Sequence, residues 1–166
     1  MKLLRRTAAS LLLIAIFLIA GCVQPPRPSG QNGMEPQLWR GRLALRVESE
    51  PPQSFFAGFE LSGHAGQGEL RLFSPLGTTL ADLHWSPQSA TLSNNGETRQ
   101  FESLDALATQ ATGTAIPIAA LFQWLAGVQT GADGWSADLS QLDDGRLTAR
   151  RTQPEPSAEL RLILER

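Results

Sequence analysis

Cys22 has the most distinctive chemical setting in this sequence, because it is the single cysteine of the chain. It directly follows Ile19-Ala20-Gly21, and an aliphatic residue and two small residues before a cysteine are typical of a lipobox. In such a motif the thiol receives a diacylglycerol in thioether linkage and the new amino terminus receives an acyl chain. We therefore predict that Cys22 is the first mature residue and is lipidated. The alternative is an ordinary thiol, and a lone cysteine excludes an internal disulfide in either case.

The residues before Cys22 have the composition of a secretory signal peptide, and we predict that residues 1–21 are removed. Lys2, Arg5 and Arg6 make the start positive, and the apolar run 11–20 is about ten residues, against roughly 20 for a membrane-spanning helix. Because two acyl chains already anchor a protein stably, three would hold it on a membrane. Val23 stands where an aspartate would mark retention at the inner membrane. We therefore expect the outer membrane, with the domain facing the periplasm.

Catalytic chemistry finds little support in the remaining residues. The two histidines, His64 and His84, have no metal-ligand spacing, and no phosphate-binding loop or nucleophile motif is present in the sequence. Asp143-Asp144 fits a solvated turn better than an acid–base dyad. We therefore predict that the protein is not an enzyme and uses no metal or cofactor.

The charge balance also restricts the partners. The chain has 14 basic and 16 acidic residues, and its one lysine and two of its arginines belong to the signal peptide. A mature chain that is acidic, with scattered arginines, is not typical of nucleic-acid binders. It also has no electrostatic attraction to an anionic membrane. Any membrane contact beyond the lipid anchor must therefore be hydrophobic.

Residues 22–37 are rich in proline, glycine and polar residues, so we predict a flexible tether there and one folded domain over residues 38–166. Alternating apolar and polar residues predict half-buried strands. These strands are expected at residues 39–47, 55–61, 69–73, 79–85, 89–92, 97–101, 135–139, 146–151 and 158–164. Asn94-Asn95-Gly96 predicts a tight hairpin turn.

A helical period replaces the alternation between these strands. Ser103 is the expected N-cap of a first helix that ends at Gly113, and Pro117 is expected at the first position of a second helix that ends at Gly127. A helix pair inserted into antiparallel strands predicts an α+β fold with one apolar face of the sheet partly covered. That apolar face is either plain core or the wall of a cavity for acyl chains.

The segment Ser74-Pro75-Leu76-Gly77 fits a type I turn between two strands, with serine, proline and glycine at their favoured positions. Leu76 does not follow from turn chemistry. Its side chain either folds back onto the core or projects outward, and the lipid anchor and acidic surface favour projection.

Three segments together resemble the LolB family of outer-membrane lipoprotein receptors. They are Trp39-Arg-Gly-Arg-Leu-Ala-Leu45, Glu69-Leu-Arg-Leu-Phe-Ser-Pro-Leu-Gly-Thr-Thr79, and Gly113-Thr-Ala-Ile-Pro-Ile through Gln123-Trp-Leu-Ala-Gly127, behind the lipobox. The resemblance covers roughly residues 38–128. It implies an incomplete antiparallel β-barrel covered on one side by short α-helices, with a hydrophobic cavity between them.

The same resemblance implies a function. Family members accept acylated lipoproteins from the periplasmic carrier LolA and release them into the outer-membrane bilayer without nucleotide hydrolysis. A protruding loop with a leucine serves insertion, and the matching residues here are Pro75, Leu76 and Gly77. Inward residues expected to line the acyl cavity are Leu43, Leu45, Phe55, Phe59, Leu70, Leu72, Leu121, Phe122 and Leu125. We expect a monomer whose transfer is driven by differences in affinity.

The C-terminal third departs from the family pattern, because the segment after Gly127 leaves less room for strands than the family usually has. We therefore expect one hairpin or more to be missing or shortened there. Two other functions stay open: a structural or assembly lipoprotein that binds a protein partner at the envelope, and a carrier of another lipid.

Overall fold

The computed structural model describes residues 37–112 and 116–165, which belong to one compact unit over residues 36–166. The predicted signal peptide, Cys22 and the predicted tether except Gln37 lie outside the described residues. Neither of the helices within the described ranges has the length and apolarity that a membrane-crossing helix needs.

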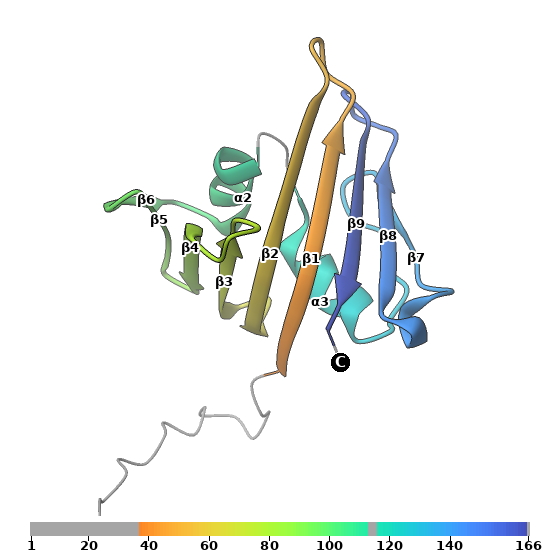
Figure 1. Ribbon diagram of the computed structural model, residues 1–166, viewed down its shortest axis with the longest axis horizontal. Helices are drawn as coiled ribbons and strands as arrows, with labels where there is room; N and C mark the ends of the chain where they lie inside the picture. Colours follow the sequence, from red (N-terminus) through yellow and green to blue (C-terminus); the bar gives the residue numbers. More distant parts are fainter. Residues whose placement is uncertain (1–36, 113–115, 166) are drawn as a thin grey trace, which may run out of the picture. The chain divides into compact units, whose positions relative to one another are not determined.

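Nine antiparallel strands form one sheet in the order β6-β5-β4-β3-β2-β1-β9-β8-β7 (Figure 1). The bounds are β1 Gln37–Val47, β2 Gln53–His64, β3 Gln67–Phe73, β4 Thr79–Ser86, β5 Ser89–Asn94, β6 Glu97–Phe101, β7 Trp135–Asp138, β8 Arg146–Arg151 and β9 Ala158–Leu164. The last strand pairs with the first, from Gly41 opposite Leu164 to Val47 opposite Ala158. Within the described residues the edge strands β6 and β7 do not pair, so the sheet is open and not closed into a barrel. The α+β antiparallel prediction is confirmed at this level.

The alternation in the sequence becomes a division between two faces of the sheet. In β1, Leu45 and Val47 are buried while Arg40, Arg42 and Arg46 are exposed. The same alternation buries leucine, alanine and aromatic residues along the other long strands. These residues form one continuous core on the face that the helices cover, because each strand contributes every second side chain to it.

Four hairpins lie at the same end of the sheet, because every strand pair is antiparallel. They join β1 to β2, β3 to β4, β5 to β6 and β8 to β9. We call this the hairpin end; in Figure 1 the β1–β2 hairpin is at the top, and β1 begins at the bottom. At the β5–β6 turn, Asn95 and Gly96 have φ angles of 52° and 83°, as a type I′ turn requires. This confirms the predicted Asn-Gly turn.

The two helices are α2 Leu104–Thr112 and α3 Ile118–Leu125. The Ser103 hydroxyl accepts a hydrogen bond from the Ala106 N–H at 3.1 Å, so the predicted N-cap is confirmed. The sequence predicts Pro117 as the first residue of α3, and this is wrong by one position. Pro117 is the N-cap, because its ψ of 87° is not helical. The predicted stop at Gly113 lies outside the described residues.

The end of α3 is fixed by a Schellman motif. Gly127 has a φ of 78°, and its N–H donates to the Trp124 carbonyl at 2.9 Å. The N–H of Val128 donates to the Gln123 carbonyl at 2.8 Å.

The two helices lie on one face of the sheet. Figure 1 shows α3 passing behind β2, β1 and β9, and α2 contacts β4, β5, β6 and α3. The helices therefore cover the apolar face of the sheet.

Candidate functional site

The tip of the β3–β4 hairpin is held in one backbone conformation. The N–H of Gly77 donates to the Ser74 carbonyl at 2.9 Å, and the N–H of Ser74 donates to the Thr78 carbonyl at 2.8 Å. The Ser74 hydroxyl also accepts hydrogen bonds from the N–H groups of Leu76 and Thr78, at 3.3 and 3.2 Å. Gly77 has a φ of 83°, which completes a type I turn followed by a left-handed residue.

Leu76 projects from this fixed turn, and 94% of its surface is exposed. It is the most exposed large hydrophobic residue among those that the structure describes. Pro75 and Gly77 beside it are also exposed, and no atom lies within 4 Å of a Cβ built on Gly77. The side chain therefore has no packing role in the folded domain, and the two orientations left open by the sequence are reduced to the outward one.

A small apolar hollow lies between the helices and the sheet. Its volume is about 40 Å³, and no polar atom contributes to its surface. The strands contribute Leu43, Leu45, Phe55, Phe59, Leu70, Leu72, Leu83, Leu160 and Leu162. The helices contribute Ala108, Ile118 and Leu121, and the connection before α3 contributes Ile116. Seven of the nine residues that we expected around an acyl cavity are thus brought together here.

The other two expected residues, Phe122 and Leu125, are buried but do not line the hollow. The ring of Phe122 packs edge-on against Trp39 and Trp85, with centroid distances of 5.6 and 6.0 Å. Trp124 on the same helix is fully buried, and its Nε1 donates to the Thr130 carbonyl at 2.7 Å, which ties α3 to the segment that follows it. Trp124 was not singled out from the sequence, although aromatic residues at this helical spacing are typical core residues.

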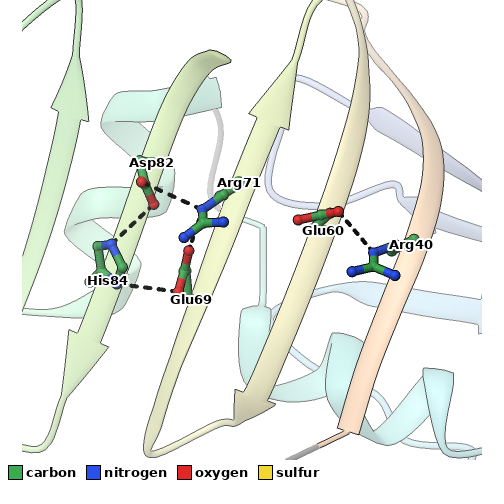
Figure 2. Close-up of polar contacts among 6 residues, drawn as sticks. All are labelled: Arg40, Glu60, Glu69, Arg71, Asp82 and His84. Atoms are coloured by element: carbon green, nitrogen blue, oxygen red, sulfur yellow. Dashed lines mark hydrogen bonds and ion pairs between the residues drawn. The ribbon is translucent and has the colours of Figure 1, made fainter. Parts of the chain in front are cut away.

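A polar cluster occupies the opposite face of the sheet, and Figure 2 shows how its four residues meet across β3 and β4. Arg71 forms ion pairs with Glu69 and with Asp82, the latter at 3.7 Å. His84 lies 3.1 Å from Asp82 and 3.8 Å from Glu69. The sequence showed no spacing for this cluster, but register pairs Glu69 with His84 and Arg71 with Asp82.

Glu69, Asp82 and His84 could in principle hold a cation, because their ligand atoms all lie within 4.8 Å of one another. However, the Arg71 guanidinium contacts both carboxylates and already supplies the positive charge that a metal would bring. Because the His84 side chain is half exposed, water also solvates this cluster. The arrangement is therefore an ion-pair network on the sheet surface.

The other candidates for chemistry lie apart from the hollow. The ring of His64 accepts a hydrogen bond from the Gly66 N–H at 3.1 Å and so closes the β2–β3 turn. Asp143 and Asp144 belong to a short 3₁₀ helix, η1 Leu142–Asp144, before Gly145 in the left-handed conformation. No pair of these residues forms a nucleophile–base contact in the part of the chain that the structure describes.

Two carboxyl groups on the exposed face have shifted pKa values. Burial raises the pKa of Glu159, but the hydrogen bond from Arg150 and the charges of Arg161 and Arg150 outweigh burial and hold that pKa below its usual range. Hydrogen bonds from Ser140 lower the pKa of Asp138. Both groups stabilise surface turns and strands and lie on β7 and β9, away from the β3–β4 hairpin.

Comparison with known proteins gives a consistent result. The family model described as "Outer membrane lipoprotein LolB" matches residues 37–160. A protein named "Outer-membrane lipoprotein LolB" from Bordetella pertussis is 32% identical over 178 residues, which cover 92% of this chain and 89% of that protein. Proteins of the same name from Bordetella petrii and Dechloromonas aromatica are 31% and 28% identical, over 89% and 80% of this chain and 86% and 81% of their own.

The family match extends beyond the region that carried the resemblance in the sequence. It continues through β7 and β8 into β9, so the C-terminal third is part of the family domain. That this third is shortened relative to other members stays a prediction. Since the match covers the described domain and the relatives align over most of both chains, this protein belongs to the outer membrane lipoprotein LolB family.

Proposed function

We propose that this protein is an outer-membrane receptor that accepts acylated lipoproteins from the periplasmic carrier LolA and inserts them into the outer membrane. Membership of the LolB family supports this function and the location at the outer membrane. The observation that carries the residue-level part of the proposal is the fixed hairpin tip with Leu76 almost fully exposed. Lipidation of Cys22 would keep this tip within reach of the same membrane.

Client acyl chains would enter between the helices and the sheet. The hollow there is entirely apolar, and burying apolar surface contributes roughly 25 cal/mol per Å². At about 40 Å³ the hollow could hold only a few water-sized groups. Acceptance of an acyl chain would therefore require α2 and α3 to move away from the sheet, and in this proposal the described arrangement is the closed state.

Transfer without nucleotide needs a difference in affinity, since hydrophobic burial itself has no direction. In the closed state the side chains that line the hollow already pack against one another. The net free energy of binding a client chain is therefore the gain from burying that chain minus the cost of opening the hollow. Leu76 would lower the cost of release, because a leucine side chain that leaves water for lipid gains about 2 kcal/mol. The bilayer is then the final and most favourable location of the client chains.

The test is transfer of a lipidated client from loaded carrier to the full lipoprotein and then to liposomes. Leu76→Glu should still receive the client but should deliver it at least about tenfold more slowly, because a carboxylate opposes entry into the bilayer. Ile163→Glu is the matched control, since Ile163 is a half-exposed aliphatic residue on the outer face of β9. This control should deliver at the wild-type rate.

Two outcomes would contradict the proposal at different points. Delivery by Leu76→Glu at the wild-type rate would remove the role of the hairpin tip. Failure of the wild-type protein to receive the client at all would favour a structural or assembly lipoprotein whose apolar face is permanently filled by its own side chains.

A further inference from the structure

Arg151 is a buried cation at the end of β8, on the helix-covered face of the sheet. Only 6% of its surface is exposed, and it is the one buried charged residue among those described. One terminal nitrogen, Nη2, donates to the Pro156 carbonyl at 2.8 Å, and the guanidinium lies 5.6 Å from the centre of the Trp135 ring. The Nε atom is buried and has no hydrogen-bond partner. No carboxylate pairs with Arg151 anywhere in residues 37–112 and 116–165.

This arrangement is costly for the folded state. A guanidinium has five N–H donors and stays charged, and here burial leaves the Nε–H without water or a protein partner. One carbonyl and one aromatic face offset only part of that loss. A buried cation with an unused donor and no counter-ion is the expected partner of an anionic oxygen group.

The position of Arg151 relative to the hollow follows from strand register. Arg151 pairs with Ala158, which pairs with Val47, and these three residues form one row on the helix-covered face. The next row on that face contains Ala149, Leu160 and Leu45. Leu160 and Leu45 line the hollow, so the two rows are about 7 Å apart along the strands.

We infer that Arg151 binds the anionic head of a single-chain lipid whose acyl chain occupies the apolar hollow. The ligand class is an acyl chain with a carboxylate or phosphate at its end. Such a ligand satisfies the guanidinium and fills the hollow at once, whereas the acylated cysteine of a client carries no negative charge in its lipid. This inference rests on the proposed function only in that the hollow must open for an acyl chain.

The experiment uses the full mature lipoprotein in a nonionic maltoside detergent at neutral pH. Dodecanoate and dodecanol, each carrying a diazirine on the chain, are photo-crosslinked, and labelled peptides are identified by mass spectrometry. The carboxylate probe should label the strands that contain Leu45 and Leu160 about tenfold more than the alcohol, as expected for one charge-assisted hydrogen bond. Arg151→Met should bring the two probes to parity, and Arg151→Lys should keep most of the preference.

Thermal unfolding of each variant shows whether the fold is retained. If Arg151→Met unfolds, the comparison of the two probes on the wild-type protein and on Arg151→Lys decides the question. Equal labelling by both probes in the wild type would reject the role of Arg151 and leave the proposed function intact. Labelling of the hollow by neither probe would reject an acyl-binding hollow, and with it both proposals.

The source of the anion is distinguished by competition. Dodecyl phosphate should displace the carboxylate probe, and inorganic phosphate at the same concentration should leave the labelling unchanged. Displacement by inorganic phosphate alone would identify a site for a free ion that is independent of the hollow, and would overturn the inference.

Discussion

At the scale of single residues, Leu76 and Arg151 are each placed where folding alone does not favour them. Leu76 leaves an aliphatic side chain in water, and Arg151 leaves a cation in an apolar interior. Burial of Arg151 costs free energy in the isolated domain, whereas Leu76 gains nothing from folding. Under the two proposals above, a lipid partner would make both arrangements favourable. Both residues lie near the hairpin end, which makes that end the region where lipid contact is expected.

Glu159 gives a residue-scale prediction of pH dependence. Because its pKa in the folded protein is below the unfolded value near 4.5, its ion pairs stabilise the fold fully above that pH. The stabilisation is lost as pH falls through the folded pKa. Glu159→Gln should lower the free energy of unfolding by about 0.5 kcal/mol at pH 7, as expected for a partly exposed pair. Denaturant unfolding at several pH values between 3 and 7 measures this difference.

Glu97→Gln serves as the control for loss of a more exposed ion pair. Glu97 pairs with Arg99 at 3.3 Å on the edge strand β6, and its side chain is 74% exposed. If the difference between wild type and Glu159→Gln were the same at pH 3 and pH 7, the two arginines would not be the source of the stabilisation.

At the scale of elements, the contact between β1 and β9 depends on Gly41. A Cβ added at this position would lie 2.0 Å from the Ile163 carbonyl oxygen, which is backbone and cannot move aside alone. β9 is the last strand of the chain, and it connects β8 and β7 to the rest of the sheet. The first and last thirds of the domain therefore meet through a site that requires glycine.

We predict that Gly41→Ala destabilises the domain by about 3 kcal/mol, the upper range for overpacking of a close contact. The matched control is Gly58→Ala on the neighbouring strand, where the nearest heavy atom to an added Cβ is the Phe73 Cβ at an ordinary 3.5 Å. That variant should change stability by less than about 1 kcal/mol. Equal effects of the two substitutions in denaturant unfolding would show that β9 can shift to accommodate a methyl group.

At the scale of the whole molecule, the attachment point of the predicted tether and the Leu76 tip lie toward opposite ends of the sheet. β1 and β3 are both antiparallel to β2 and so run in the same direction. The tether joins the start of β1 at Gln37, whereas the tip follows the end of β3. Register places Phe73 level with Gly58 and Arg42, so the tip is roughly 25 Å from the start of β1, at about 3.3 Å per residue. Residues 22–36 can span at most about 50 Å. The tether is thus long enough for a lipidated Cys22 and Leu76 to reach the same bilayer.

Deletion of residues 24–35 should therefore slow delivery to the outer membrane several-fold, because the remaining tether spans only about 10 Å. Receipt of the client from the carrier should be unchanged. Transfer to liposomes that contain the anchored receptor measures both steps. Replacement of the deleted segment by glycine and serine residues of equal number should restore delivery, and delivery at full rate by the short variant would contradict the geometry.

The sequence by itself determined the local features of this protein. Alternation predicted the strands, Ser103 and Gly127 predicted helix ends, and Asn95-Gly96 predicted a turn, because each signal depends on residues close together in the chain. The apolar positions on one face of the sheet also followed from that alternation, including six of the side chains that line the hollow, and the helical period added Leu121.

Only the tertiary structure decided the features that depend on pairing between distant segments. Strand order joined β9 to β1 and left the sheet open, and register brought Glu69, Arg71, Asp82 and His84 together. Period-two alternation places Arg151 on the same face as Leu147 and Ala149, but it cannot show that the guanidinium stays buried and does not reach solvent at the strand end. The outward direction of Leu76 likewise needed the fold. Turn residues fix the bend of the backbone, whereas exposure depends on which other segments pack nearby.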